Sequence, residues 1–304
     1  MRCRAQSSTW CPTPRVSRPV RCWPSTADTC ENGIDVDLNE RCAVVTGGAH
    51  GIGRALAEEL ARRGARVVVA DLNVERAQRV ADRIGGVAVE CNVGSPEGIA
   101  DLVEAAQDAF GPVSVLCSNA GYSDNGDGLT LPPEDLRRIV EVNLLSHVWA
   151  AQAVLPGMLD RGEGWLIQTI SSTALITGPS FMGYTLSKHG ALGFAEWVAL
   201  NYRHCGIQVT CLCPNAVNTG MLGRNEDDES RTPIIDLAAL GDVVEPEDCA
   251  RQALDAAAAG KFLALPHPRV GDSFLRKATD YDAWLDRTHQ RLQKMQLAGH
   301  SPAE

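Results

Sequence analysis

From residue 41 onward, short apolar runs alternate with segments of helical periodicity, and this alternation restricts the chain to very few folds. The apolar runs are rich in Val and Ile, as in strands that are buried on both faces of a sheet. Repeated strand–helix–strand units require a parallel sheet, because each helix returns the chain to the same edge. We therefore predict an α/β fold, a Rossmann-type doubly wound parallel sheet with helices on both faces, as a single domain over about residues 37–298. The predicted strands are 41–46, 66–70, 87–91, 113–118, 165–170, 207–213 and 261–265.

Residues 1–36 show neither helical nor strand periodicity. They contain four prolines that would break most regular elements: Pro12, Pro14, Pro19 and Pro24. We expect a disordered extension or a start codon assigned too far upstream. The segment also faintly resembles a transit peptide, since it is rich in Arg and poor in acidic residues, and this alternative stays open. In the predicted domain, we expect a substrate lid at about 219–245 and an amphipathic C-terminal helix at about 273–295.

Charge, hydropathy and cysteine placement narrow the class of partner. A formal net charge of −10 argues against binding to nucleic acid, and no apolar run approaches the roughly 18–20 residues that span a bilayer. Five of the 11 cysteines lie in or beside the predicted strands, which favours buried free thiols in a reducing, cytoplasmic setting. The histidines lack ligand spacing, so we expect no metal site. These observations leave a small molecule as the expected binding partner.

The segment Thr46-Gly47-Gly48-Ala49-His50-Gly51-Ile52-Gly53 forms a glycine-rich loop between the first strand and the first helix. Glycines let the backbone turn sharply and approach a pyrophosphate, which the N-terminus of the following helix attracts. Asp71 ends the second predicted strand, where a carboxylate can accept hydrogen bonds from the adenosine ribose. Its charge would repel a 2′-phosphate, and neither Arg nor Lys follows it directly. We therefore predict NAD, not NADP, as the cofactor.

Tyr184 and Lys188 stand four residues apart on one face of a helix predicted over about 184–203. A tyrosine with an ordinary pKa of about 10 is a poor base at neutral pH. A nearby ammonium group and a positively charged nicotinamide ring would both stabilise the phenolate and so lower that pKa. The pair predicts a proton-transferring tyrosine in the interconversion of a secondary alcohol and a ketone.

These motifs resemble those of the short-chain dehydrogenase/reductase family. The spacing Gly-x-x-x-Gly-x-Gly, the triplet Asn119-Ala120-Gly121 and the Tyr-x-x-x-Lys pair follow one another in that family's order, over about residues 41–265. The resemblance implies a catalytic set of Asn143, Ser171, Tyr184 and Lys188. It also implies a cofactor-binding set of Thr46, Gly47, Gly51, Ile52, Gly53, Asp71, Asn92, Val93, Asn119, Ala120, Gly121, Tyr184, Lys188, Pro214, Val217 and Thr219.

In this resemblance, Ser171 orients the substrate oxygen, Lys188 lowers the pKa of Tyr184 and holds the ribose, and Asn143 anchors a proton relay. Ser171 precedes Tyr184 by 13 residues, the family's usual interval, whereas the adjacent Ser172 would require a one-residue deletion. We expect Ser171 to be the catalytic serine, with Ser172 as the alternative. Asn92 and Asn215 depart from the family, which usually has Asp and Gly at these positions.

The sequence does not name the substrate. The candidate lining residues are mostly apolar and predict a neutral, moderately hydrophobic alcohol or ketone: Tyr122, Leu175, Phe181, Met182, Met221 and Leu222. One rival function is an NADPH-dependent 3-oxoacyl-type reductase, which Asp71 disfavours. Another is an NAD-sensing regulatory protein, which typically lacks the Tyr–Lys pair. The family resemblance further implies a homodimer or homotetramer.

Overall fold

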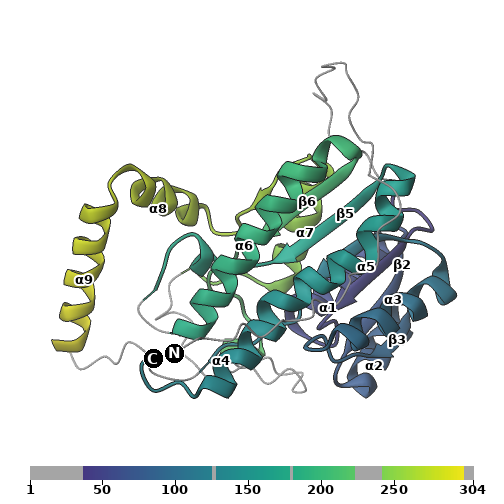
Figure 1. Cartoon of the computed structure of the whole chain (residues 1–304), viewed down its shortest axis with the longest axis horizontal. Helices are drawn as coiled ribbons and strands as arrows, with labels where there is room; N and C mark the ends of the chain where they lie inside the picture. Colours follow the sequence, from purple (N-terminus) through teal and green to yellow (C-terminus); the bar gives the residue numbers. More distant parts are fainter. Residues whose placement is uncertain (1–36, 125–127, 179–180, 223–241, 298–304) are drawn as a thin grey trace, which may run out of the picture. The chain divides into compact units, whose positions relative to one another are not determined.

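The computed structural model describes residues 37–124, 128–178, 181–222 and 242–297, all within one compact unit. The predicted extension and most of the predicted lid lie outside these described residues. Seven parallel strands form one sheet in the order β3-β2-β1-β4-β5-β6-β7, which confirms the predicted doubly wound fold (Figure 1). The strands are β1 (Cys42–Thr46), β2 (Arg66–Asp71), β3 (Val87–Glu90), β4 (Val113–Ser118), β5 (Gly164–Thr169), β6 (Ile207–Leu212) and β7 (Leu263–Ala264).

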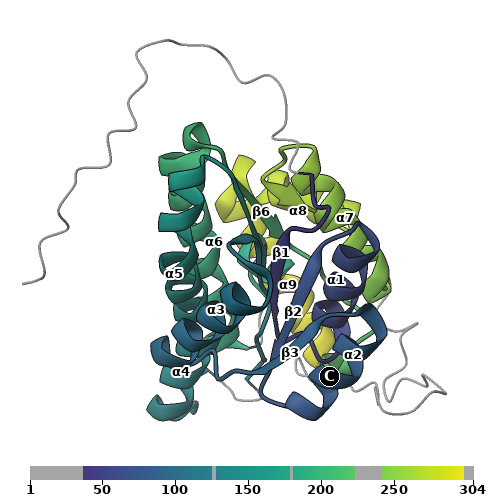
Figure 2. The same cartoon turned by 90° about the vertical axis from the view of Figure 1, so that its right-hand side faces the viewer.

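Helices cover both faces of the sheet (Figure 2). One face carries α1 (Gly51–Arg62), α2 (Val74–Ile84) and α7 (Pro246–Ala258), and the other carries α3 (Pro96–Phe110), α5 (Ser146–Arg161) and α6 (Met182–Tyr202). Successive strand residues point to opposite faces, so each strand serves two cores. Val44 and Leu116 belong to the core beneath α3, α5 and α6, whereas Val45 and Cys117 belong to the core beneath α1 and α7.

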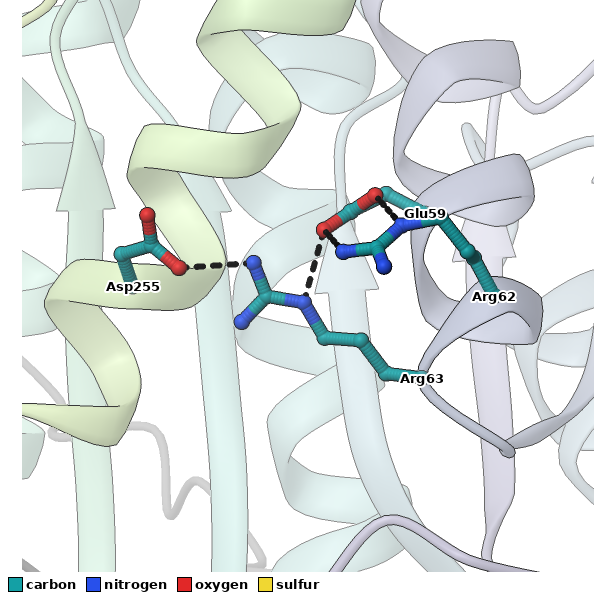
Figure 3. Close-up of polar contacts among 4 residues, drawn as sticks. All are labelled: Glu59, Arg62, Arg63 and Asp255. Carbon is teal, nitrogen blue, oxygen red and sulfur yellow. Dashed lines mark hydrogen bonds and ion pairs between the residues drawn. The ribbon is translucent and has the colours of Figure 1, made fainter.

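An ion-pair network joins the C-terminal end of α1 to α7 at the surface (Figure 3). Both oxygens of Glu59 accept hydrogen bonds from Arg62, at 2.6 and 2.7 Å, and one also accepts from Arg63 at 2.8 Å. Arg63 in turn donates to Asp255 of α7 at 2.7 Å. The hydrogen bonds from the two guanidinium groups lower the pKa of Glu59 to about 2. The network links α1, which follows the glycine-rich loop, to α7, which precedes β7.

The long helix predicted from about Pro133 contains a wide turn. It consists of α4 (Pro133–Val140), a π-helical segment (Glu141–Leu145) and α5 without a break between them. Such π-helical turns occur frequently at functional sites. Here the segment contains Asn143, whose side chain is fully buried.

The C-terminal helix predicted at 273–295 is two helices, α8 (Pro268–Thr279) and α9 (Tyr281–Leu297). Asp280 separates them because its backbone is extended and its carboxylate accepts a hydrogen bond from the Ala283 N–H at 3.0 Å, which starts a new helix. Pro268 occupies the first turn of α8, where its missing N–H costs nothing. None of the helices within the described ranges is long and apolar enough to cross a membrane.

Candidate active site

A cleft of about 460 Å³ lies at the carboxyl ends of the strands, where the sheet order reverses between β1 and β4. This is the usual ligand-binding position in doubly wound sheets. Of the predicted site residues, all but two line it: Gly47, Gly51, Ile52, Gly53, Asp71, Asn92, Val93, Asn119, Ala120, Gly121, Ser171, Tyr184, Lys188, Pro214, Val217 and Thr219. Thr46 and Asn143 are buried behind its wall.

The glycine-rich loop has no room for side chains at its key positions. Gly47 and Gly51 have φ values of +62° and +53°, in the left-handed region that favours glycine. A Cβ on Gly53 would overlap the Gly47 carbonyl and come within 2.5 Å of the Asn119 amide nitrogen. That amide donates to the carbonyl oxygens of Thr46 and Gly47, at 3.0 and 3.2 Å. The buried Thr46 hydroxyl accepts from the Asn119 and Ala120 N–H groups, so the ends of β1 and β4 are joined beneath the loop.

Asp71 faces this loop from the end of β2. Its carboxylate accepts hydrogen bonds from the Ala49 N–H at 3.1 Å and the Asn73 N–H at 3.0 Å. Asn92, beyond β3, accepts from the Gly94 N–H at 3.1 Å in the same manner. The backbone approach that a pyrophosphate requires and the carboxylate that a ribose requires therefore meet in one cleft, so the residues present fit a dinucleotide.

Beside the loop, a second and smaller pocket of about 70 Å³ is lined by His50 and four arginines, together with Ala49 and Val80. The arginines are Arg54 on α1 and Arg76, Arg79 and Arg83 on α2. Glu58 pairs with both Arg54 and Arg83, and Glu247 pairs with Arg54. The sequence did not mark these arginines as a group: Arg76, Arg79 and Arg83 stand 5, 8 and 12 residues after Asp71 and return to the loop on α2. Arg54 reaches the same pocket from α1.

Tyr184 lies in the first turn of α6, which begins at Met182, two residues earlier than predicted. The reason is a cap from a remote segment. Asp124 is buried, and its two carboxylate oxygens accept from the Gly183 N–H at 3.1 Å and the Tyr184 N–H at 3.0 Å. A carboxylate at a helix N-terminus is stabilised by the helix dipole. No local sequence signal marked Asp124, since it acts across 60 residues.

Lys188 is buried one turn further along α6, with its ammonium group 5.7 Å from the centre of the Tyr184 ring. It donates to the Thr169 carbonyl at 2.9 Å. Burial lowers the pKa of Lys188 to about 8. Burial also raises the pKa of Tyr184, and a hydrogen bond with Ser171 acts in the opposite direction. Lys188 by itself therefore leaves the pKa of Tyr184 above its ordinary value. The predicted lowering combined Lys188 with the positive charge of the nicotinamide ring, and it stays a prediction.

Asn143 holds the loop that follows β4. Its carbonyl accepts from the Tyr122 N–H at 3.0 Å, and its amide donates to the Tyr122 carbonyl at 2.8 Å and to the Ser187 hydroxyl at 3.3 Å. A Cβ on Gly121 would lie 3.0 Å from the Asn143 oxygen and 3.4 Å from the Lys188 ammonium. Asn143 is therefore near the Lys188 end of the cleft, as the resemblance implied, but it is bonded to protein groups.

The two adjacent serines have different surroundings. Ser171 lines the cleft, and its hydroxyl accepts from the Thr173 N–H at 3.1 Å. The Ser172 hydroxyl instead donates to the Asn215 side-chain oxygen at 3.2 Å, and Ser172 is absent from the cleft wall. Since Ser171 also bonds Tyr184, its environment is the one expected of the catalytic serine.

The candidate substrate-lining residues divide into two groups. Tyr122 and Met221 line the cleft, whereas Leu175, Phe181 and Met182 do not. Leu175 is buried in the core and Met182 points to solvent at 39% exposure. For Leu222, only the backbone is described. Arg138 lines the cleft as well, which the prediction of a mostly apolar wall did not anticipate.

The cysteines in the described ranges fit the expectation of buried free thiols. Cys42, Cys91, Cys117, Cys211, Cys213 and Cys249 are buried free thiols, and Cys205 is a partly buried one. Burial raises the thiol pKa values, to about 11 for Cys42 and Cys91. Across the same ranges, no group of three or more His, Cys, Asp or Glu side chains is arranged to hold a metal ion.

Comparisons with known proteins agree with this architecture. Residues 41–230 match the family model described as short chain dehydrogenase. A 1-deoxy-11-beta-hydroxypentalenate dehydrogenase of Streptomyces exfoliatus is 38% identical over 193 residues, 61% of this chain and 70% of that protein. A cyclohexanol dehydrogenase of Acinetobacter sp. is 32% identical over 220 residues, 70% of this chain and 86% of that protein.

Among solved structures, a short chain dehydrogenase/reductase from Burkholderia phymatum in complex with NAD superposes with a TM-score of 0.73. It is 26% identical, and the match covers 82% of this chain and 96% of that one. The family model covers well over half of the chain and includes both the glycine-rich loop and the Tyr–Lys pair. The chain therefore belongs to the short-chain dehydrogenase/reductase family of oxidoreductases.

Proposed function

We propose that the protein is an NAD-dependent dehydrogenase that interconverts a neutral, moderately hydrophobic secondary alcohol and its ketone. One observation carries the proposal: Ser171, Tyr184 and Lys188 line the same cleft as the glycine-rich loop and Asp71. A proton-transfer group and a dinucleotide-type loop in one cleft are what alcohol oxidation by hydride transfer requires.

The cofactor would be held along the lining residues. The loop backbone from Gly47 to Gly53 would take the pyrophosphate, and Asp71 would accept from the adenosine ribose. Asn92, Val93 and the Asn119-Ala120-Gly121 triplet would line its adenosine half, and Pro214, Val217 and Thr219 its nicotinamide half. When bound, oxidised NAD supplies the hydride acceptor and a positive charge.

The protein side chains would handle the proton. The Ser171 hydroxyl would donate to the substrate oxygen, and the Tyr184 phenolate would remove the hydroxyl proton as the carbonyl forms. Because burial raises the pKa of Tyr184 in this structure, the phenolate needs cationic stabilisation. Lys188 would supply part of this stabilisation, and Asn143 would hold the neighbouring backbone and anchor the proton relay.

A cyclic alcohol is the best substrate class to test first. The cyclohexanol dehydrogenase named above acts, by its name, on a cyclic alcohol. In this chain, the cleft wall includes the apolar side chains of Val142, Ile170 and Met221, and its charged members include Arg138 besides Asp71 and Lys188. Such a wall favours a largely apolar substrate.

The test is a panel of secondary alcohols, including cyclohexanol, steroids, terpenoids and aryl carbinols, offered with NAD or with NADP. We expect growth of reduced-cofactor absorbance with NAD, and at least tenfold lower kcat/KM with NADP. If no alcohol in the panel is oxidised while NADH still binds, a cofactor-sensing role replaces the proposed one.

A second candidate function, NADPH-dependent ketone reduction, is favoured by one specific observation. The pocket formed by His50, Arg54, Arg76, Arg79 and Arg83 adjoins the loop beside Asp71, and arginine clusters recognise phosphate groups. The negative charge of Asp71 would repel the 2′-phosphate of NADPH and so disfavours this second function. Titration of the protein with NAD and NADP separates the candidates, because tighter binding of NADP would select the reductase.

We further propose that the protein forms a homodimer or homotetramer through its long helices. Trp197 and Leu200 on α6 are 53% and 83% exposed, and apolar side chains of this size favour burial against a partner. Light scattering at micromolar concentration should give a multiple of the 32.5 kDa chain mass. A monomer mass alone would contradict this proposal.

A further inference from the structure

His267 is a buried histidine to which the proposed reaction gives no role. It lies between β7 and α8 and is 2% exposed. Its ring contacts the segment that follows β6 on both sides: the Asn215 N–H lies 3.1 Å from Nδ1, and the Ala216 carbonyl oxygen lies 3.0 Å from Nε2. One side chain therefore bridges two consecutive peptide units that are more than 50 residues away in sequence.

These two contacts select one form of the ring. A backbone N–H can only donate, so Nδ1 must accept and carry no proton. The proton of the neutral imidazole then lies on Nε2, which donates to the Ala216 carbonyl. An asparagine at this position can place an acceptor where Nδ1 lies and so reproduce the contact with the Asn215 N–H. A glutamine can place a donor where Nε2 lies and so reproduce the contact with the Ala216 carbonyl.

The bridged segment is connected to the catalytic serine. The Asn215 side chain accepts from the Ser172 hydroxyl at 3.2 Å, and the Ser172 N–H donates to the Pro214 carbonyl at 2.7 Å. Ser172 directly follows Ser171, and Pro214, Asn215 and Val217 all line the cleft. Hydrogen bonds thus connect the three segments that follow the neighbouring strands β5, β6 and β7, at the catalytic end of the cleft.

We propose that His267 is a positioning residue for hydride transfer, which fixes the 215–216 backbone and, through Asn215 and Ser172, the relative placement of Val217 and Ser171. This inference rests on the proposed function. It also accounts for Asn215, where the family usually has glycine: the side chain that glycine lacks makes the bond to Ser172. Misplacement of reacting groups by about 1 Å can cost as much as a hundredfold in rate.

The experiment compares His267→Phe, which keeps a ring but makes neither hydrogen bond, with His267→Asn and His267→Gln, which each restore one. The probe is cyclohexanol deuterated at the carbinol carbon, or the panel alcohol with the highest turnover. For His267→Phe we expect kcat to fall about 10- to 100-fold, a larger deuterium isotope effect on kcat, and a Kd for NADH within threefold of wild type. His267→Asn and His267→Gln should each recover part of kcat.

His289→Phe on the exposed side of α9 is the matched control and should leave all three quantities unchanged. Amide hydrogen exchange of the Asn215 N–H, followed by NMR on the cofactor-free protein, tests the contact without turnover; we expect at least tenfold faster exchange in His267→Phe.

If no alcohol is oxidised, the proposed function fails, yet the exchange and NADH-binding results still test the contact of His267 with Asn215. Unchanged exchange in His267→Phe, or an unchanged isotope effect with kcat within twofold, would overturn the positioning role. If His267→Phe does not fold, equal kcat and isotope effect in wild type, His267→Asn and His267→Gln would overturn it.

Discussion

The two halves of the cleft are held in place by different means. The proposed cofactor half, formed by Gly47–Gly53, Asp71 and Asn92, depends on backbone conformation, on hydrogen bonds that Asp71 and Asn92 accept from N–H groups, and on the amide of the Asn119 motif. The catalytic half, formed by Asn143, Ser171, Tyr184, Lys188 and residues 214–219, depends on buried side chains that bond to backbone far away in sequence. Sequence motifs therefore define the first half almost completely, whereas in the second half they name the candidate reacting groups and omit the residues that support them.

Lys277 extends the pattern of remote supports in the catalytic half. This α8 lysine is buried and donates to the Leu175 carbonyl at 3.0 Å, across 102 residues. Its ammonium group lies 5.3 and 4.9 Å from the ring centres of Tyr281 and Trp284 on α9. Cation–π contacts of this kind stabilise a desolvated lysine, so the C-terminal helices support the loop that begins at Ser171.

The largest expected effect would come from a methyl group in the cofactor half. Gly53→Ala places a Cβ against the Gly47 carbonyl and the Asn119 amide, which should destabilise the fold by about 1–3 kcal/mol and weaken NAD binding at least a hundredfold. The control is Gly193→Ala on α6, where a Cβ meets nothing within 4 Å and should be neutral or stabilising by up to about 1 kcal/mol. Calorimetric titration and thermal unfolding measure both. Normal NAD binding by Gly53→Ala would show that the loop is not the cofactor cradle.

In the catalytic half, removal of one hydroxyl group should lower turnover without changing the affinity for the cofactor. Ser171→Ala should lower kcat about 10²- to 10³-fold, by analogy with removal of an oxyanion-hole donor, while the Kd for NAD stays within twofold. Ser172→Ala removes the bond to Asn215 and should lose much less. Steady-state kinetics of the two variants decide between the serines, and the reverse ranking would assign the catalytic role to Ser172.

Asp71 should affect the choice of cofactor and leave the chemistry intact. Loss of its carboxylate in Asp71→Ala removes charge-assisted hydrogen bonds, and we expect NAD to bind about tenfold more weakly. NADP should bind more tightly than to wild type, because the Asp71 carboxylate no longer repels a 2′-phosphate beside the arginine-lined pocket. Fluorescence titration with both reduced cofactors measures the ratio. A wild-type preference for NADP would contradict the assignment of Asp71.

The effect that is smallest at neutral pH is on the pH dependence of stability, and it originates at a residue behind the catalytic half. His147 is fully buried, bonds through Nδ1 to Gln168, and has its pKa lowered by burial to about 3. Between pH 6.5 and 3 the unfolded chain takes up a proton at this residue that the folded chain does not, so stability falls as the pH falls.

His147→Asn keeps a donor toward Gln168 and cannot titrate. Relative to this variant, the free energy of wild-type unfolding should decrease by about 1.4 kcal/mol per pH unit within that window. Urea unfolding at several pH values measures the difference in slope. Parallel curves for the two proteins would mean that His147 is not held neutral by burial.

Several features of the fold followed directly from sequence patterns. Val-rich runs and the Asp71 strand end predicted the parallel sheet, and the glycine spacing predicted the tight loop at Gly47–Gly53, because both depend on local backbone requirements. That this loop holds a phosphate group stays a prediction. Asp124, His267 and Lys277 could not be predicted, since each acts on a segment more than 50 residues away. The break at Asp280 was missed because helical periodicity continues through it. The arginine pocket was missed because it exists only once α1 and α2 are packed together.

The most direct test of the account is Tyr184→Phe. This substitution removes one oxygen atom from the catalytic half of the cleft and leaves the cofactor half unchanged. The measurement is the Kd for NAD together with the rate of NADH formation from the best alcohol of the panel. The account predicts a Kd within twofold of wild type and a fall in turnover of about 10²- to 10⁴-fold, the usual contribution of a general base. Wild-type turnover by Tyr184→Phe would contradict it.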